Sequence, residues 1–512
     1  MPEHPTAFQT HGRIRLALAA ILAAAIIRLW ILPVVHSFRV DETLIVWTIR
    51  NGFAQIVSNA QISLQSIAFC WLEWLVSRLF GVNEVSLRLL PVLASIASLY
   101  VYYRIGAEFI DREAGVFFAV LYLSLQTVAF QTPNARPYSL ALWAEAAALL
   151  WLLRWLRSGR ILAGLLWIAC SAVACHLHYL FVIPMALESA YVLWRALGRP
   201  IPLRQILAGA FLAVVLLLPA VPQALTMSRQ ATLLSFAATP TLVALVDAIA
   251  PLYLVGPAAL FALVVLTQGQ SVRWRGVQAN SGVVTLGALL LLLPAFGLFA
   301  LSRFTTVRLF QERYLLPAAP GFVLLWGGVL RALEPPFFRR LSVASALVVS
   351  LVFLGRGSVF PNYRPEDWRS AVRSMPDSGA VLLYSGLVEA RRLDWLEDPA
   401  RWGYLMAPVL AYRSSTTREN GFPLPFEFGA AEQAYQARML EGPLRDRDTI
   451  TVIVLRSFWG PAWLDWISER LSGAGFRPVS HVQFTNVEIA VFHRAAIAAS
   501  AGGRNVASPG RN

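Results

Sequence analysis

The feature that most constrains this chain is a series of long apolar segments that continues through its first 355 residues. Each segment is close to the roughly 17–25 residues that a helix needs to cross a bilayer. Since 57% of all residues are apolar and only 14% are charged, a water-soluble globule and a disordered chain are both excluded. The predicted spans lie near residues 14–35, 86–103, 115–132, 139–153, 161–179, 181–194, 206–222, 240–266, 281–301, 315–330 and 341–355.

The arginines between the spans predict how the chain is oriented. All 43 basic residues are arginine, and 15 of the 25 in residues 1–355 fall in alternate loops when the N-terminus is cytoplasmic. Positively charged loops stay on the cytoplasmic side, so this pattern indicates a multi-pass protein with that orientation. It requires residues 62–80, which include Glu73, to lie along the outer membrane surface with residues 43–57. Both segments are expected to be amphipathic helices of a long first outer loop, 36–85.

The composition changes near residue 356, where shorter apolar runs alternate with polar helices. The pattern predicts a membrane domain at 1–355, an α/β domain at 356–495 on the outer side, and a disordered tail at 496–512. In the α/β domain, we expect strands at 380–386, 449–457 and 482–494 and helices at 366–375 and 462–471.

Several charged residues fall at the outer ends of spans, where polar groups are costly unless they face a cavity. The loops 36–85, 133–138 and 302–314 would together form such a cavity at the outer boundary. The candidate catalytic residues are Asp41 and Glu42. The candidate substrate-binding residues are Arg88, Arg136, Tyr138, His178, Tyr179, Arg308, Arg313 and Tyr314.

Each candidate has a chemical and a structural interpretation. A carboxylate such as Asp41 can accept the proton of an attacking sugar hydroxyl, or it can stabilise the first turn of a helix beginning near Thr43. The arginines can form forked hydrogen bonds with a phosphate, or they can anchor helix ends at the interface. His178 can bind the substrate or be a hydrogen-bonded structural residue.

The sequence contains no pattern typical of a metal or cofactor site. Cys170, Cys175, His176 and His178 do not have the spacing of a zinc site, and Cys70 lies alone in an apolar stretch. The formal net charge of +14 is concentrated in the membrane part, where it suits topology and phosphate binding better than nucleic-acid binding. We therefore expect no cofactor and no nucleic-acid partner; these residues do not indicate a divalent metal, and its use stays open.

Two other functions remain open on the residues alone. Arg28, Glu145, Glu188 and Asp247 lie in apolar segments, and intramembrane charges also occur along the path of a polytopic transporter or lipid flippase. A non-catalytic protein whose outer domain binds a partner is the other alternative.

Six short motifs follow one another along the chain. They are VDETL at 40–44, LFGVNEVSLRLLP at 79–91, NARPYSL at 134–140, HLHYL at 176–180, ERYLLPAAP at 312–320 and NYRPEDWRSAV at 362–372. In this order they resemble the GT-C superfamily of polyprenyl-phosphate-sugar-dependent glycosyltransferases. The similarity is to family 39, the protein mannosyltransferase-like family, and most of all to its bacterial Rgt-type and aminoarabinose-transferase-like members. It extends over about residues 10–495.

This resemblance implies a mainly α membrane protein with a GT-C-type bundle of about 11 transmembrane helices, outer interfacial helices and a small periplasmic α/β domain. It implies an inverting transfer of a hexosyl or pentosyl unit from a polyprenyl-phosphate donor to a hydroxyl of a glycan, lipid or protein. Asp41 would be the base, with Glu42 as its neighbour, and arginines would bind the donor phosphate.

The resemblance also places the reaction at the outer face of a bacterial inner membrane, in the synthesis of lipopolysaccharide or another envelope glycan. Two departures concern the acceptor. Asn134 stands where the family often has an acidic residue, and SLQSI at 63–67 replaces a pair of prolines.

Overall fold

The computed structural model describes residues 19–198, 201–229, 238–267, 273–274, 281–334, 336–354 and 365–495. The chain divides into two compact units, the first ending at Pro365 and the second beginning at Glu366. Most of the segment between the composition change at 356 and this boundary lies outside the described residues, as does the tail predicted to be disordered.

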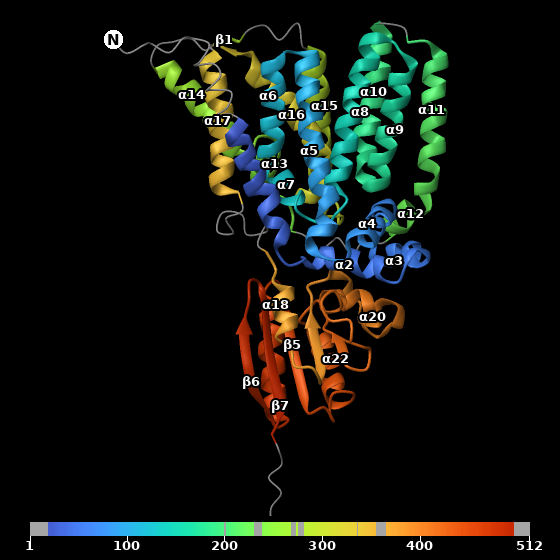
Figure 1. The fold of residues 1–512 in the computed structure, drawn as a ribbon, viewed down its shortest axis with the longest axis vertical. Helices are drawn as coiled ribbons and strands as arrows, with labels where there is room; N and C mark the ends of the chain where they lie inside the picture. The colour runs from blue at the N-terminus through green and yellow to red at the C-terminus, as the bar shows by residue number, and fades with distance from the viewer. Residues whose placement is uncertain are drawn as a thin grey trace, which may run out of the picture. The chain divides into compact units, whose positions relative to one another are not determined.

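The first unit is a bundle of helices (Figure 1). Each of the eleven predicted spans overlaps one of these helices or a consecutive pair. After the helical segment Ala19–Val35, the bundle helices are α5 (Glu84–Phe109), α6 (Arg112–Ser124), α7 (Gln126–Gln131), α8 (Tyr138–Ser158), α9 (Ile161–Leu177), α10 (Val182–Gly198), α11 (Leu203–Leu217), α12 (Val221–Arg229), α13 (Leu242–Ile249), α14 (Leu252–Thr267), α15 (Ser281–Phe304), α16 (Ala319–Ala332) and α17 (Pro336–Phe353).

Five of the described helices are long and apolar enough to cross a membrane, and the number rises to seven if each of two bent pairs is one span. The bent pairs are Ala19–Val35 with Val40–Arg50, at 59°, and α13 with α14, at 74°. This is fewer than the eleven apolar segments because some of them form shorter helices. The segment 115–132, for example, is interrupted at Leu125, whose backbone is extended between α6 and α7.

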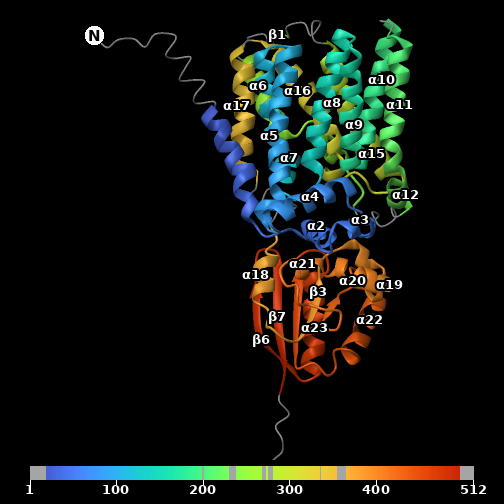
Figure 2. The ribbon, with the colours of Figure 1, turned by 45° about the vertical axis from the view of Figure 1, so that its right-hand side comes forward.

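Three short helices, α2 (Val40–Arg50), α3 (Ile56–Ser63) and α4 (Ile67–Phe80), lie together at one end of the bundle (Figure 2). They occupy the region predicted to contain surface helices. The Ser66 hydroxyl caps the start of α4 by accepting a hydrogen bond from the Phe69 N–H, and Gly81 ends the helix with a φ of +77°. At 14 residues, α4 is too short to cross a bilayer.

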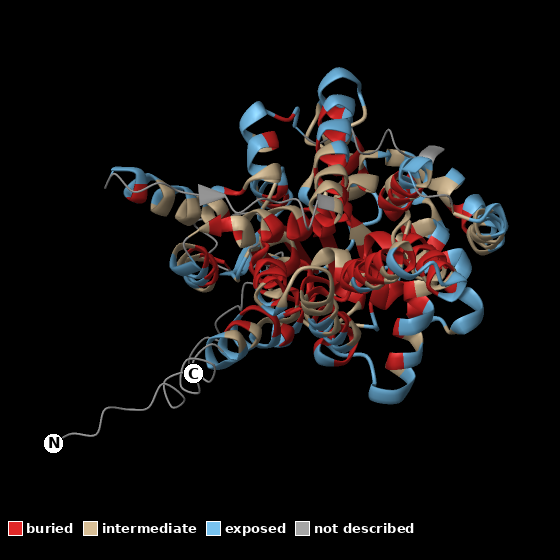
Figure 3. Cartoon of the chain, turned by 90° about the horizontal axis from the view of Figure 1, so that it is seen from above, coloured by how far each residue is buried: buried red, intermediate tan, exposed pale blue. Residues whose placement is uncertain are grey.

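Close contacts between small residues hold the bundle helices together. At the crossing of α5 and α6, a β-carbon added to Gly106 would lie 2.5 Å from the backbone nitrogen of Gly115. Small residues let membrane helices approach each other closely, so packing replaces the hydrophobic driving force that water would supply. Figure 3 shows the buried residues concentrated on the central helices and the exposed ones on the periphery.

The end of the bundle opposite α2–α4 carries ion pairs between helix ends. These arginines belong to loops that the sequence predicts on one side of the membrane, and in the structure they pair with acidic residues at the same end of the bundle. The pairs join Glu108 with Arg154 and Arg157, Asp111 with Arg331, and Glu113 with Arg339 and Arg340.

The second unit is built around a five-stranded sheet with the strand order β4-β3-β5-β7-β6. Strands β4, β3 and β5 are parallel, whereas β7 is antiparallel to both β5 and β6. The central strands β3 and β5 are buried along their whole length, as their continuous apolar sequences predict. The strands are β3 (Ala380–Tyr384), β4 (Gly421–Pro423), β5 (Thr449–Leu455), β6 (Phe476–Gln483) and β7 (Val487–Arg494).

Six helices accompany this sheet: α18 (Trp368–Arg373), α19 (Leu393–Glu397), α20 (Pro399–Leu405), α21 (Ala407–Leu410), α22 (Ala430–Glu441) and α23 (Gly460–Gly473). The two predicted helices correspond to α18 and α23. The predicted strand segment 482–494 contains the end of β6 and all of β7. In the first unit, the two-residue strands β1 (Arg273–Trp274) and β2 (Leu333–Glu334) pair antiparallel.

Candidate active site

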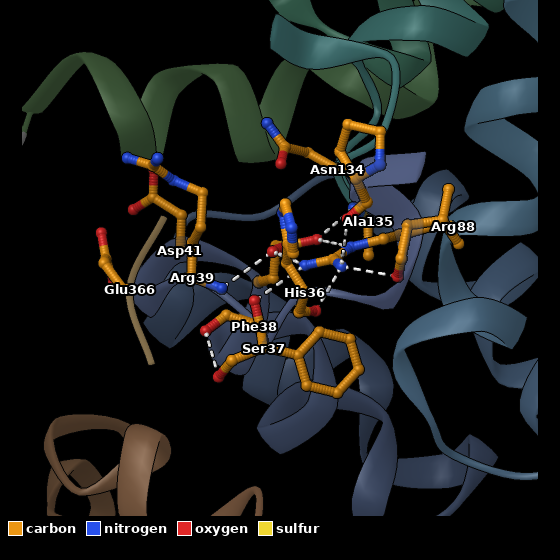
Figure 4. A network of polar contacts seen from close by, with 12 residues as sticks. His36, Ser37, Phe38, Arg39, Asp41, Arg88, Asn134, Ala135 and Glu366 are labelled. Atoms are coloured by element: carbon orange, nitrogen blue, oxygen red, sulfur yellow. Dashed lines mark hydrogen bonds and ion pairs between the residues drawn. The ribbon is translucent and has the colours of Figure 1, made fainter. Parts of the chain in front are cut away.

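Glu42 on α2 and Arg88 on α5 form an ion pair that is closed to solvent. Figure 4 shows Arg88 among His36, Ser37 and Ala135 in the surrounding network of polar contacts. Arg88 Nε donates to Glu42 Oε1 at 2.8 Å and Nη2 donates to Oε2 at 2.6 Å, and both side chains are at most 2% exposed. The backbone N–H groups of Ala135 and Arg39 also donate to the Glu42 carboxylate, at 2.6 and 2.8 Å. With four donors from the protein, this carboxylate has little capacity left to accept a proton from a substrate.

Arg88 is likewise engaged by the protein. Its Nη1 donates to the backbone carbonyls of Val34 at 2.8 Å and His36 at 2.6 Å, and its Nη2 donates to that of Ser37 at 3.1 Å. The guanidinium therefore fastens the segment before α2 to α5. These contacts favour a structural role for Arg88 over contact with a donor phosphate.

Asp41, the neighbour of Glu42, has a different environment. Its side chain is 43% exposed, and Oδ2 lies 3.9 Å from Arg313 Nη1. Arg136 Nη1 donates to the Asp41 backbone carbonyl at 3.0 Å, so two loops distant in sequence meet at α2. Burial raises the pKa of Asp41, but the charges of Arg136, Arg313 and Arg39 outweigh it and hold the pKa below its ordinary value of 3.8. Asp41 is thus an ionised carboxylate open to a substrate.

Arg136 and Arg313 retain unused donors beside Asp41. The Nε atom of each is buried, and it has no hydrogen-bond partner among the described residues. Arg136 Nη2 donates to the Tyr138 hydroxyl at 3.0 Å, and the Arg313 guanidinium lies over the Tyr314 ring at 4.9 Å. Two guanidinium groups that face one carboxylate leave an excess of positive charge, and a bound anion would satisfy both the charge and the N–H groups.

His178 lies at the end of α9 against the same arginines. Its ring centroid is 5.2 Å from that of Tyr138 and 5.9 Å from that of Phe181. Burial, and then the charges of Arg136 and Arg313, lower the pKa of His178 to about 3. The imidazole is therefore neutral at physiological pH, and its buried Nδ1 has no partner among the described residues. A neutral ring of this kind can exchange a hydrogen bond with a sugar hydroxyl.

Two other candidate substrate-binding residues, Tyr179 and Arg308, form hydrogen bonds with protein groups. The Tyr179 hydroxyl donates to Gln223 Oε1, and Gln223 Nε2 donates to the Gln65 carbonyl at 2.6 Å. Arg308 donates to backbone carbonyls at the end of α15, including that of Ser302. The Tyr179 contact holds α12 beside the segment after α9, and the Arg308 contact is local to the end of α15. Six other candidates form one connected group: Asp41, Arg136, Tyr138, His178, Arg313 and Tyr314.

Two residues near the site have surroundings that the sequence did not reveal. Glu73, predicted to lie on a surface helix, is completely buried on α4, and neither carboxyl oxygen has a hydrogen-bond partner among the described residues. Burial, and then the negative charge of Glu42, raise its pKa well above the ordinary 4.5. Asn134, at the position of the family's acidic residue, donates to the Phe130 carbonyl at 2.8 Å and so closes the turn after α7.

Two of the four charged residues in the apolar segments, Arg28 and Glu188, have separate hydrogen-bond partners. Arg28 Nε donates to the Leu351 carbonyl at 2.7 Å, and Glu188 Oε2 accepts a hydrogen bond from Trp167 Nε1 at 2.6 Å. Glu145 is completely buried on α8. Within the described part of the chain, no group of three or more His, Cys, Asp or Glu residues is arranged to hold a metal ion.

Comparison with known proteins gives a family match and a fold. Residues 65–225 match the sequence model of the dolichyl-phosphate-mannose-protein mannosyltransferase family. The structure is similar to a crystal structure of ArnT from Cupriavidus metallidurans bound to undecaprenyl phosphate, with a TM-score of 0.54 and 12% identity over 95% of this chain and 98% of that one. The apo form of the same protein gives a TM-score of 0.52 and 11% identity over 94% and 98%. No curated protein matches the sequence.

Proposed function

We propose that this chain, a member of the GT-C superfamily of membrane glycosyltransferases, transfers a sugar from a polyprenyl-phosphate donor to an acceptor hydroxyl. The observation that carries the proposal is the open group at α2. There an ionised, partly exposed Asp41 lies beside Arg136 and Arg313, and each arginine has a buried N–H group without a protein partner.

The donor phosphate fits the two guanidinium groups. Arginine presents several N–H donors in a fixed plane and binds phosphate with two parallel hydrogen bonds. When the bond between sugar and phosphate breaks, negative charge grows on the phosphate, and fixed guanidinium groups stabilise that charge. The similar ArnT structure contains undecaprenyl phosphate, which supports a polyprenyl-phosphate donor for this chain.

Asp41 supplies the base. Its carboxylate accepts the proton of the acceptor hydroxyl while the oxygen attacks the anomeric carbon from the face opposite the phosphate. The new glycosidic bond forms as the carbon–oxygen bond to phosphate breaks, so the anomeric configuration inverts and polyprenyl phosphate leaves. The low pKa of Asp41 keeps the carboxylate ionised before each turnover.

The proposed setting is the outer face of a bacterial inner membrane, with the N-terminus cytoplasmic and the second unit periplasmic. The transferred unit is a hexose or pentose, and the acceptor is a cell-envelope glycan or lipid such as lipopolysaccharide. The proposed transfer reaction contains no step that involves a metal ion. The arginine distribution along the sequence supports this orientation.

Mass spectrometry of envelope glycans and lipids tests the function. A strain that lacks the gene is compared with strains that express the wild-type chain, Asp41→Asn or the exposed-surface control Asp394→Asn. We expect a mass difference of one sugar between the deletion strain and the strains expressing the wild type or the control. Asp41→Asn, present at normal levels in the membrane, should resemble the deletion. Full restoration of the sugar by Asp41→Asn would contradict the assignment of the base.

A further inference from the structure

The second unit contains a cavity of about 410 Å³ that is separate from the residues discussed above. It is bounded by α23, β6, β7 and the first residue after β5, elements that lie side by side in the sheet and its covering helix (Figure 2). Cavities that hold small ligands typically have about 300–1,000 Å³, so this one has room for a ligand of moderate size.

One wall of the cavity is a single face of α23. Leu464, Ser468 and Ser472 line it at intervals of four residues, and Asp465 lies three residues before Ser468, so the four side chains share one helical face. The Ser468 hydroxyl donates to the Leu464 carbonyl at 2.6 Å and the Ser472 hydroxyl donates to that of Ser468 at 2.8 Å. Both hydroxyl protons are used, so the two oxygens present lone pairs that can accept hydrogen bonds.

The opposite wall comes from the sheet. Glu488 and Phe492 are four residues apart on β7 and therefore share one face. Pro478 and His481 on β6 are three residues apart and would face opposite sides of a regular strand. The register shift between Pro478 and Ser480 brings both residues into the lining of the same cavity.

A chain of charged contacts fixes the polar part of this wall. Glu488 Oε1 lies 2.6 Å from His481 Nε2, and Glu488 Oε2 lies 3.2 Å from Arg456 Nε. Glu488 is only 13% exposed, and the Arg456 guanidinium compensates its charge. Asp465 across the cavity has no ion pair among the described residues and remains available as an acceptor. A second carboxylate also makes the cavity unfavourable for an anion.

We propose that this cavity is a saccharide-binding site. A sugar ring has hydroxyl groups that would donate to Asp465, Ser468 and Ser472, and C–H faces that would pack against Leu464 and Phe492. Arg456 can donate its remaining N–H groups to ring or hydroxyl oxygens, and the second ring nitrogen of His481 can exchange a hydrogen bond with a sugar hydroxyl. The proposal concerns binding alone, goes beyond the transfer reaction and does not depend on Asp41.

Saturation-transfer difference NMR on the full chain in lipid nanodiscs tests the proposal. The probes are the methyl glycosides of glucose, galactose, mannose and arabinose, and inorganic phosphate is added as a competitor. We expect saturable binding of at least one glycoside that added phosphate does not displace. Asp465→Asn should weaken glycoside binding about tenfold, as expected for loss of one hydrogen bond to a charged group. Ser472→Trp, which fills the cavity, should abolish it.

Matched variants locate the binding. Asp394→Asn and Ser374→Trp make the same changes at exposed positions of the same unit, and they should bind like the wild type. Asp41→Asn should also leave this binding unchanged, which separates the cavity from the transfer site. Glycoside binding that is equal in all variants, or absent from the wild type, would overturn the proposal. If Ser472→Trp does not fold, Asp465→Asn decides the question.

Discussion

Asp41 and Glu42 are adjacent in the chain, yet the two carboxylates have opposite surroundings. Glu42 points into the protein, where Arg88 and two backbone N–H groups use its acceptor sites. Asp41 faces outward beside guanidinium groups that still have unused donors. Successive residues at the start of a helix point about 100° apart, so one turn can place a structural carboxylate and the carboxylate proposed as the base side by side.

The buried Glu42–Arg88 pair, the closed pair, helps to position the open group around Asp41. Glu42 joins α2 to α5 through Arg88 and to the 133–137 loop through Ala135. That loop carries Arg136, which contacts the Asp41 carbonyl. The geometry of the open group therefore depends on the buried ion pair, although the buried pair touches no substrate.

Arg88→Met breaks the closed pair, and its effect on stability should be the largest. It leaves Glu42 charged and buried without its main partner, which typically costs about 3–5 kcal/mol. Arg340→Met is the matched control, because Arg340 pairs with Glu113 but is 68% exposed, and exposed pairs contribute about 0–1 kcal/mol. Denaturant unfolding in detergent measures both. If both variants lose the same free energy of unfolding, the buried Glu42–Arg88 pair stabilises the protein no more than an exposed pair does, which contradicts its structural role.

Arg136→Gln and Arg313→Gln weaken the open group. Each should reduce the affinity for polyprenyl phosphate by about tenfold or more, since a hydrogen bond to a charged group contributes about 1.5–3 kcal/mol. Arg308→Gln is the control, since the guanidinium of Arg308 is engaged by carbonyls at the end of α15. Titration of the purified protein with polyprenyl phosphate gives the three affinities. The assignment fails if Arg308→Gln weakens binding as much as the other two.

Glu73 extends the comparison to a carboxyl group with neither an ion pair nor an opening to solvent. Its folded-state pKa is raised above 4.5, so its contribution to stability is complete below that pH and is lost as the pH rises toward the folded pKa. Between about pH 5 and pH 8, the unfolding temperature of the wild type should fall relative to that of Glu73→Gln. Glu469→Gln, at an exposed position on α23, should retain the wild-type profile. Parallel profiles for the wild type and Glu73→Gln would contradict the raised pKa.

Tyr138→Phe should have the smallest effect. It removes one hydrogen bond to Arg136 but keeps the ring beneath the guanidinium, so the transfer rate should fall by no more than about tenfold, the equivalent of about 0.5–1.5 kcal/mol. Steady-state kinetics measure the change, with the wild type in the same lipid as reference. A loss as large as that of Asp41→Asn would mean that Tyr138 takes part in the chemistry itself.

The sequence predicted much of this fold because apolar segments and arginine positions are strong signals. It indicated the bundle, short helices between the first and second predicted spans, and a second unit with buried strands. Several of the candidate site residues, which the sequence singled out by type, lie together around Asp41, and their roles stay a prediction. Residue type alone did not separate Arg88, Arg308 and Tyr179 from Arg136 and Arg313, because the distinction lies in which N–H and O–H groups are already paired across distant loops.

The sequence did not reveal the burial of Glu73 or the hydrogen bond of Asn134, because both depend on contacts that residue type alone does not specify. The burial of Glu73 depends on how α4 packs against its neighbours, and a polar residue on a 14-residue amphipathic helix looks equally suited to the interface. Asn134 looked like a lost carboxylate, whereas its contact with the Phe130 carbonyl gives it a local role at the end of α7. An asparagine side chain can bond to the carbonyl four residues earlier, but the residue type alone does not show that Asn134 does so.

The proposed roles of the two adjacent acids, Glu42 as a structural residue and Asp41 as the base, are tested most directly by Asp41→Asn. Polyprenyl-phosphate binding and single-turnover transfer are measured on the same preparation of the purified variant. We expect binding to be retained and transfer to fall by about 10²–10⁴-fold, the usual contribution of a general base. Retained transfer, or loss of binding and transfer together in a folded protein, would contradict the assignment of Asp41 as the base.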